Sequence, residues 1–474
     1  MQNKKLKINF ILPACSLTGG PLAILEYANR LIERGHEVSI TTPSNLFWRG
    51  SHPFGWFDFK GKVYYKKYGK IQRVILKTLV NYVIKFLLKL GGRRAEKMQL
   101  FTLVIDFLSS LSTIARIPEC DLNIATLWTT SYAAYLSNKG KHVYFMQHYE
   151  EVFYDNEPVN ILKRFAVRMS YALPVYKVAN SSWLQKQIEE KFGQHVPFSN
   201  NALDVKDFNP AEKQSEKDGI IRVITYSRPE SWKGFQDAAA AMKIIFEKYK
   251  GRIEWNVFGA LYKNIPPENE LAPYKYHKGL HFKELAALYA SSDIALCPSW
   301  YESFPLPPLE AMASGTATVT TSYGTEDYAF HEQNALVVKP RDIAAMTEAI
   351  ERLINDSELR KKLALEGRIT AERFNWDSAV EKREKILLDI YEGKTSYDVE
   401  KATRINLKDV SGIDFDFAPV DVEIEEGEIL RDKKGNYYRI INCQKKIIND
   451  INLIENYKNT EMKTLDNIEI SRIP

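Results

Sequence analysis

The segment LKINFILPACSLTGGPLAILEYANRLIERGHEVSITT, which runs from Leu6 to Thr42, decides the fold class. Residues 6–12 are mostly apolar and predict a buried strand, after which a loop contains Gly19 and Gly20. Apolar residues then recur at helix spacing, at Leu22, Leu25, Ala28, Leu31 and Ile32. Gly35 stands where a helix commonly ends, and residues 38–42 predict a second strand. A strand, a helix and a strand in this order predict a parallel sheet.

The same alternation continues along the chain. In the first part we expect further strands at 122–126, 143–146 and 177–180. The polar residues 209–219 predict a linker. Beyond it we expect strands at 221–227, 253–259, 294–298, 317–321 and 335–338, and helices at 235–249, 282–291, 308–314 and 377–391. The pattern predicts two consecutive α/β domains, which we bound at residues 1–205 and 219–376.

Residues 395–474 differ in character from the rest. The stretch from Lys408 to Glu428 holds eight acidic residues against one basic residue. Residues 420–425 alternate as a half-exposed strand does, and residues 432–436 predict a hairpin turn before another strand. We expect a small β-rich appendix, which could be a binding module, an assembly element or a tail without a separate role.

Composition sets broad limits on function. The chain has 474 residues, with 65 basic against 60 acidic residues and a net charge of +5, which is too mild to predict nucleic-acid binding. The four cysteines lie far apart and predict reduced thiols in a cytosolic protein. The first residues predict neither a signal peptide nor a membrane span.

The densest chemical signal is the segment PSWYESFPLPPLE, residues 298–310. A strand ends at Pro298, Glu302 lies in the following loop, and the prolines 307–308 favour a helix start that would place Glu310 in its first turn. Ligands of open α/β sheets bind beyond the carboxyl ends of the strands. There the backbone N–H groups at a helix start favour a phosphate, and a carboxylate can accept hydrogen bonds from two ribose hydroxyls. The alternative is that Glu310 only complements the helix dipole and Glu302 lies in water.

Two further loops carry weaker signals. Arg228 and Lys233 follow a predicted strand, and two cations there can neutralise a diphosphate, although they could also be ordinary surface charges. Gly19 and Gly20 follow the first strand, where glycine lets the backbone approach a phosphate or sugar. Taken alone, however, two glycines there more often mark a simple turn.

Taken together, these motifs resemble those of family 4 glycosyltransferases of the GT-B class, over about residues 6–393. The resemblance rests on residues 18–20, 200–210, Arg228-x4-Lys233-Gly234, 257–259, Gly279 with 284–293, and Glu302-x7-Glu310. It implies retaining enzymes that use nucleotide sugars and have two Rossmann-like domains facing a cleft, with residues 377–394 returning to the first domain. Residues 144–150 and 324–328 are similar to bacterial surface-polysaccharide enzymes, some of them rhamnosyltransferases.

The resemblance also implies roles for individual residues. Arg228 and Lys233 would hold the donor diphosphate, Glu310 the ribose and Glu302 the donor sugar near its 3-hydroxyl, while His148 would lie near the reaction centre unless it is only structural. Backbone groups would complete the nucleotide-sugar site at Gly19, Gly20, Gly259, Lys278, Leu280, Ser303, Phe304 and Leu306.

One position departs from the family pattern, because Pro305 stands where the family usually has glycine. Proline removes an N–H from the phosphate loop, which leaves the identity of the donor open. No cofactor or metal is expected: the DxD sequence at 414–416 lies in the appendix, and His277 with His281 lacks further ligands. The resemblance implies attack by the acceptor on the face from which the phosphate leaves, with the leaving phosphate taking the acceptor proton. The absence of an evident covalent nucleophile in the sequence agrees with this.

The net charge conceals a basic window. Residues 60–94 contain eleven basic residues and no acidic one, within a predicted insertion at 60–116. Residues 70–89 predict a cationic amphipathic helix that lies on an anionic membrane, with contacts from Lys66, Lys67, Lys70, Arg73 and Lys77. The alternative is an ordinary amphipathic helix packed on the first domain. Membrane contact would suit a lipid-linked acceptor.

The sequence therefore predicts a retaining glycosyltransferase on the cytoplasmic face of the membrane. Its donor would be a nucleotide diphosphate sugar, and its acceptor a glycan or a lipid-linked glycan of the cell surface. Two alternatives stay open: a GT-B nucleotide-sugar epimerase, and a non-catalytic sugar-nucleotide-binding member of a polysaccharide assembly complex. The sugar, the linkage and the oligomeric state are not predicted.

Overall fold

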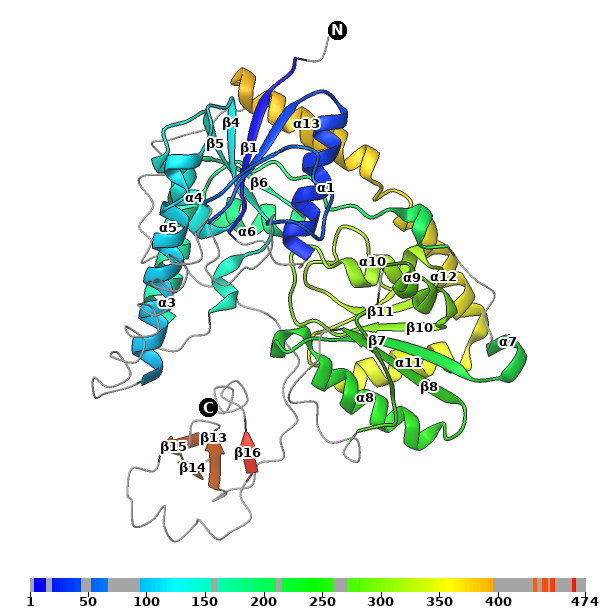
Figure 1. Cartoon of the computed structure of the whole chain (residues 1–474). Coiled ribbons are helices and arrows are strands. Elements are labelled where there is room, and N and C mark those ends of the chain that lie inside the picture. Colours follow the sequence, from blue (N-terminus) through cyan, green and yellow to red (C-terminus); the bar gives the residue numbers. More distant parts are fainter. Residues whose placement is uncertain are drawn as a thin grey trace.

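A computed structural model describes residues 4–13, 19–43, 53–66, 94–154, 160–209, 215–259, 271–280 and 282–394, together with four short strands between 429 and 465. Two six-stranded sheets organise residues 7–338, and each is flanked by helices (Figure 1). Every strand pairing within these two sheets is parallel. The predicted pair of Rossmann-like α/β domains is therefore confirmed.

The first sheet has the order β3-β2-β1-β4-β5-β6. Its strands are β1 (Lys7–Ile11), β2 (Glu37–Thr41), β3 (Lys62–Tyr64), β4 (Leu122–Ala125), β5 (Lys141–Met146) and β6 (Tyr176–Ala179). The helices are α1 (Gly19–Glu33), α3 (Arg94–Leu111), α4 (Trp128–Leu136), α5 (Ile161–Ala172) and α6 (Ser182–Phe192). The apolar strands pack against these helices in two buried clusters. The edge strand β3, which lies inside the predicted insertion, was not predicted.

The second sheet has the order β12-β11-β10-β7-β8-β9. Its strands are β7 (Ile221–Ser227), β8 (Ile253–Gly259), β9 (Lys275–Lys278), β10 (Ile294–Cys297), β11 (Ala317–Thr321) and β12 (Leu336–Val338). The helices are α7 (Ser215–Asp218), α8 (Phe235–Lys248), α9 (Phe282–Ser291), α10 (Leu306–Ala313), α11 (Ile343–Asn355) and α12 (Ser357–Ala371). Two further apolar clusters form the cores of this domain.

One helix start differs from the prediction. Helix α10 begins at Leu306, with Pro305 as its N-cap, so Glu310 is the fifth helical residue and not part of the first turn. The prolines fit early positions of the helix because the N–H groups there have no partner within the helix. The interpretation of Glu310 as a first-turn complement to the helix dipole is therefore wrong.

Both sheets have the strand order of a doubly wound Rossmann domain, with the reversal between β1 and β4 in the first and between β7 and β10 in the second. Ligands of such sheets bind at the carboxyl ends of the strands on either side of the reversal. The loops after β1, β7 and β10 are therefore the places in which to look for a site.

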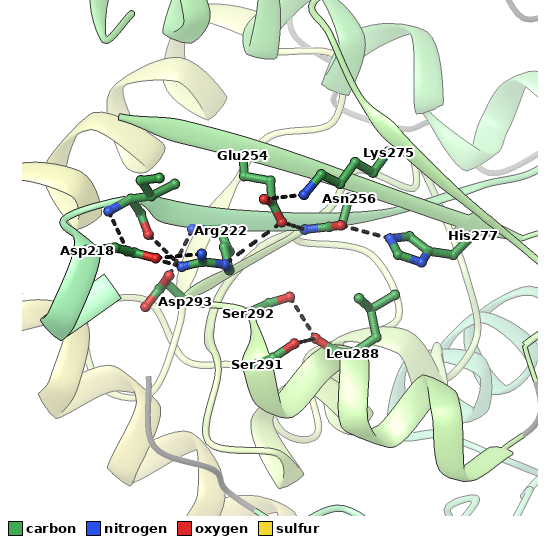
Figure 2. Close-up of polar contacts among 11 residues, drawn as sticks. Asp218, Arg222, Glu254, Asn256, Lys275, His277, Leu288, Ser291, Ser292 and Asp293 are labelled. Carbon is green, nitrogen blue, oxygen red and sulfur yellow. Dashed lines mark hydrogen bonds and ion pairs between the residues drawn. The ribbon is translucent and has the colours of Figure 1, made fainter. Parts of the chain in front are cut away.

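The opposite end of the second sheet is fixed by a polar network (Figure 2). Arg222, near the start of β7, pairs with Asp218 (Nη2 to Oδ2, 2.8 Å), and its backbone N–H donates to Asp293 Oδ2 at 2.8 Å. Glu254 on β8 accepts a hydrogen bond from Lys275 Nζ on β9 at 2.5 Å. This network fixes the amino ends of the strands and leaves their carboxyl ends to the loops that carry the candidate site.

The chain then returns to the first domain through α13 (Trp376–Glu392), which lies against α1 (Figure 1). Val380 and Leu387 join a core cluster of the first domain. Glu384 is buried and pairs with His36 (Oε1 to Nε2, 2.9 Å) and Arg34 (Oε2 to Nε, 2.5 Å).

The appendix forms a small separate sheet of order β15-β14-β13-β16. Strands β13 (Ile429–Asp432) and β14 (Tyr437–Ile441) pair in antiparallel fashion, as the predicted hairpin requires, and β15 (Gln444–Ile447) and β16 (Lys463–Leu465) complete the sheet. The strand predicted at 420–425 lies outside the described residues.

The predicted basic helix also lies outside the described residues, with Lys67, Lys70, Arg73 and Lys77, whereas Lys66 is described and exposed. Within the described part of the chain, no helix combines the length and the apolar character needed to cross a bilayer.

Candidate active site

An ion pair joins the two loops that leave the second sheet at its reversal point. The ammonium of Lys233, in the loop after β7, contacts Oε1 of Glu302, in the loop after β10. The side chains are 24% and 12% exposed, so the pair is largely removed from water. The sequence predicted each residue as a separate ligand contact, and the structure brings the two together.

Glycine at 234 makes this contact possible. Gly234 has φ = +68°, and a Cβ there would lie 1.9 Å from the carbonyl oxygen of Pro298, at the end of β10. Next to it, the Trp300 N–H donates to the Trp232 carbonyl at 2.7 Å. Backbone contact between the two loops therefore fixes the distance from Lys233 to Glu302.

Glu302 is ionised in this arrangement. Burial opposes its ionisation, but the ammonium of Lys233, together with His148 and a hydrogen bond from Ser299 Oγ at 2.9 Å, holds the pKa of Glu302 below its ordinary value. The alternative of a solvated Glu302 is therefore wrong.

A second carboxylate, Glu310, lies within electrostatic range of a second cation, Arg228. Burial raises the pKa of Glu310 to about 7, against the opposing influence of the Tyr289 hydroxyl and the charge of Arg228. Arg228 itself is exposed at the end of β7. The structure thus gathers all four charged residues predicted for the donor, Arg228, Lys233, Glu302 and Glu310, at the carboxyl ends of β7 and β10.

Glycine at 259 lets the ends of strands β7 and β8 pack closely beside Arg228. Gly259, which ends β8, has φ = +135°, and a Cβ there would lie 2.1 Å from the Ser227 carbonyl oxygen. Ser227 Oγ is buried without a hydrogen-bond partner in the described part of the chain. Lys278 ends β9, and Leu280 follows Gly279, whose φ is +60°. These positions lie where the resemblance places the nucleotide, although their contacts with it stay predictions.

His148 reaches this group from the first domain, two residues after β5. Burial lowers its pKa to about 4, with the charge of Glu302 acting against the shift and that of Lys233 adding to it. Its ring lies 4.7 Å from the Phe153 ring and 6.3 Å from the Tyr301 ring, between centroids. Nε2 is buried and has no hydrogen-bond partner among the described residues. A neutral imidazole with an unused ring nitrogen therefore faces the Lys233–Glu302 pair.

The glycines after β1 lie near His148. Gly19 and Gly20 are the first residues of α1. A Cβ on Gly20 would lie 3.4 Å from the side-chain amide oxygen of Gln147, the residue before His148. Thr18 lies outside the described residues.

In the loop of residues 303–306, some groups lie beside the candidate site and others pack into the core. Ser303 is buried and donates through Oγ to Asn180 of the first domain. The Phe304 ring packs 5.3 Å from Tyr328, so only its backbone is available to a ligand. The Pro305 carbonyl accepts a hydrogen bond from Tyr328 OH at 2.7 Å, and Leu306 begins α10.

Sequence reasoning missed the polar contacts between the domains. Asn180 and Ser181 both contact Ser303, and Asp327 accepts hydrogen bonds from the Ser182 N–H at 3.0 Å and from Asn200 Nδ2 at 2.6 Å. The signals available were that Asn180 and Ser181 stand at the end of a predicted strand, and that Asn200 and Asp327 lie in the segments 200–210 and 324–328 on which the resemblance rests.

His277 has a structural partner, since its Nε2 lies 2.8 Å from Asn256 Oδ1 in the network of Figure 2. His281 lies outside the described residues. In the part of the chain that the structure describes, no three His, Cys, Asp or Glu side chains gather as a metal site would require.

Comparison with known proteins identifies the second domain. Residues 206–370 match the family model described as glycosyl transferases group 1. The chain is 26% identical over 280 residues to the O-antigen biosynthesis protein RfbC of Myxococcus xanthus, a match that covers 58% of this chain and 21% of that protein. The chain thus spans about a fifth of the length of this relative.

Solved structures share the fold over most of the chain. Sucrose-phosphate synthase from Thermosynechococcus elongatus superposes with a TM-score of 0.60 at 16% identity, covering 82% of this chain and all of that one. HepE from Anabaena, in complex with UDP-glucose, gives a TM-score of 0.57 at 16% identity and covers 81% of this chain and all of that one. At this identity the likeness establishes the GT-B fold.

Proposed function

The chain carries a glycosyl transferases group 1 domain within a GT-B fold, and from this premise we propose that it is a retaining glycosyltransferase. It moves a sugar from a nucleotide diphosphate sugar to a glycan or lipid-linked acceptor in cell-surface polysaccharide biosynthesis. The observation that carries the proposal is the group of Arg228, Lys233, Glu302 and Glu310 at the reversal point of the second sheet, with His148 facing it from the first domain.

The charges of this group suit the reaction. Breaking the anomeric C–O bond places negative charge on the leaving diphosphate, which Lys233 and Arg228 stabilise by preorganised electrostatics. The acceptor hydroxyl attacks from the side on which the diphosphate leaves, and its proton passes to a phosphate oxygen. Glu302 binds the donor sugar and Glu310 the ribose hydroxyls. Because the two cations neutralise the diphosphate, we propose that no metal is required, and turnover should persist in EDTA.

Two similar proteins support the proposed nucleotide-sugar donor and the proposed role in cell-surface polysaccharide biosynthesis. RfbC is named for O-antigen biosynthesis, and the HepE structure contains UDP-glucose. Neither fixes the sugar for this chain.

A donor screen followed by turnover tests the proposal. Thermal shift with UDP, GDP, dTDP and ADP sugars reveals the donor, because a ligand at 100 times its Kd stabilises the native state by about 2.7 kcal/mol. The best donor should then be hydrolysed slowly and transferred to glycan acceptors, with retention of anomeric configuration by NMR. Conversion of the donor to an epimer without any acceptor would favour the epimerase alternative. Binding without turnover of any donor would favour a non-catalytic role.

We also propose that the first domain binds to the cytoplasmic face of an anionic membrane. Exposed apolar side chains on α3 and α5, both of which contact α4, support this: Val104, Ile105, Leu108, Ile161, Leu162, Phe165 and Met169. Groups of exposed apolar side chains are typical of interaction surfaces, and these two helices belong to the domain whose sequence includes the basic window.

Vesicle co-sedimentation tests this contact. A variant with Lys66, Lys67, Lys70, Arg73 and Lys77 changed to glutamate should lose binding to vesicles rich in phosphatidylglycerol, while wild-type protein binds them more strongly than phosphatidylcholine vesicles. Unchanged binding of the variant would refute the membrane proposal and leave the transferase proposal intact.

A further inference from the structure

A single buried amide links the two halves of the candidate site. Asn180 follows β6 in the first domain and is 2% exposed. Its Nδ2 donates to the Gln147 carbonyl at 3.0 Å, and its Oδ1 accepts a hydrogen bond from Ser303 Oγ in the second domain. The amide therefore donates a hydrogen bond within the first domain and accepts one from the second domain.

The two partners of Asn180 are neighbours of the residues that carry the proposed chemistry. Gln147 immediately precedes His148, and Ser303 immediately follows Glu302. Ser303 is 1% exposed and also lies 3.2 Å from Ser181 Oγ, between the two hydroxyl oxygens. A shift of Asn180 relative to either partner would therefore change the separation of His148 and Glu302.

Only an amide of this length satisfies both partners at once. Asparagine offers an N–H donor and a carbonyl acceptor on one short side chain, whereas aspartate offers acceptors alone. Because Asn180 is buried, water cannot replace either hydrogen bond. Loss of the Nδ2 donor would leave the Gln147 carbonyl without this hydrogen bond, and loss of the Oδ1 acceptor would remove one partner of Ser303.

We propose that Asn180 is a positioning residue, whose amide holds the His148 loop of one domain in register with the Glu302 loop of the other. This inference rests on the proposed glycosyl transfer, since the loops matter only if they act on a donor. The function of Asn180 is then to keep the reacting groups at their separation when the two domains enclose a donor.

A second contact between the domains provides a matched control. Asp327 Oδ2 accepts hydrogen bonds from Ser182 and Asn200 of the first domain, so it also joins the domains through polar contacts. Neither Ser182 nor Asn200 adjoins His148 or Glu302 in the chain. Loss of Asp327 therefore weakens the domain contact without removing the link between the two loops.

The experiment compares Asn180→Ala, Asn180→Asp and Asp327→Ala in the full-length chain. For each we measure kcat and KM for hydrolysis of the nucleotide sugar selected by thermal shift, the Kd for the matching nucleoside diphosphate, and the Tm. Hydrolysis needs no identified acceptor. Both Asn180 variants should lower kcat by about 30- to 100-fold, since a displacement of about 1 Å can cost that much. The nucleotide Kd should stay within about threefold, and Asp327→Ala should lower kcat by less than about threefold.

Asn180→Asp is the decisive variant if the alanine variant does not fold, because it keeps the size of the side chain and the acceptor for Ser303. Equal losses of kcat in the Asn180 and Asp327 variants would show that Asn180 only stiffens the domain contact, and would overturn the inference. Unchanged kcat in Asn180→Asp would overturn it as well. If wild-type protein binds nucleotide but turns over no donor, the proposed function itself fails, and the positioning role fails with it.

Discussion

Replacing Lys233 with alanine tests the candidate site most directly. The substitution removes the ammonium that contacts Glu302 and leaves Ser299 as the remaining hydrogen-bond donor to Oε1. Because Lys233 is the strongest of the influences that lower the pKa of Glu302, and burial acts in the opposite direction, the pKa of this carboxyl group should rise. The variant therefore disturbs both the diphosphate contact and the ionisation of Glu302.

The size of the effect follows from how deeply the pair is buried. Exposed ion pairs contribute about 0–1 kcal/mol to stability, whereas removing one partner of a buried pair costs about 3–5 kcal/mol. With side chains 24% and 12% exposed, the pair lies between these limits, and we expect a loss of about 2 kcal/mol. For a domain of this size that corresponds to a Tm lower by about 4–8 °C.

The effect on turnover should be much larger than the effect on folding. Removing one preorganised group that stabilises charge in a transition state typically lowers kcat by about 10²–10³. A protein with an unfolding free energy of about 5–15 kcal/mol remains folded after losing about 2 kcal/mol. Loss of activity with a cooperative melting transition would therefore report on chemistry and not on unfolding.

The assay measures donor hydrolysis and the melting curve on the same preparation. Lys248→Ala is the control, because Lys248 also forms a lysine–glutamate pair, with Glu351 at 2.8 Å, on helices away from the candidate site. Its side chain is 57% exposed, so neither the Tm nor kcat should change appreciably. Full turnover by Lys233→Ala would refute the assignment of this residue to the diphosphate.

Three further predictions concern single residues. Gly234→Ala places a Cβ 1.9 Å from the Pro298 carbonyl oxygen at positive φ, so it should destabilise the protein by at least about 2 kcal/mol in chemical denaturation; an unchanged midpoint would contradict the loop geometry. Because the pKa of Glu310 is about 7 in the free protein and ribose hydroxyls favour its ionised form, donor affinity by calorimetry should rise from about pH 6 to pH 8, and Glu310→Gln should abolish that rise. The pKa of His148 is about 4 in the folded protein and 6.5 in the unfolded chain, so only the unfolded chain takes up a proton at this residue as the pH falls below about 6.5. The stability that the neutral His148 contributes is therefore complete above about pH 6.5 and is lost as the pH falls toward 4. His148→Gln should make the fall of Tm over that range shallower.

Most strands of the two sheets were predictable because they are short, largely buried runs with apolar residues, bounded by polar or glycine residues. Strands β7, β8 and β11 begin and end where the sequence predicted, since buried parallel strands give the clearest apolar runs. Strands β3 (Lys62–Tyr64) and β9 (Lys275–Lys278) were both missed, because they have only three and four residues, are rich in lysine and lie on the edges of their sheets. A segment so short has no periodicity to detect.

The sequence predicted which residues belong to the candidate site, but it did not predict which of them contact one another. Resemblance pointed to Lys233 and Glu302 separately, yet their pairing depends on Gly234 meeting the Pro298 carbonyl across 64 positions of the chain. Asn180 carries no pattern, because a single polar residue at the end of a strand is common and its Ser303 partner lies in the other domain. Asp327 lies in the segment 324–328, whose resemblance to other enzymes says nothing about its contacts with Ser182 and Asn200. Contacts between domains depend on how the domains are placed, which no local sequence pattern records.

The Lys233–Glu302 pair also shows how one arrangement can serve both the empty and the occupied site. Without a donor, each charge neutralises the other, so neither is left buried and alone. In the proposed function, a diphosphate would compete with Glu302 for the ammonium. A diphosphate alone would then leave the carboxylate dependent on Ser299, at a cost of about 1–3 kcal/mol. A donor sugar that presents a hydroxyl to Glu302 removes that cost. We therefore expect the pair to favour the complete nucleotide sugar over the nucleotide that remains after transfer, which would promote release of the product.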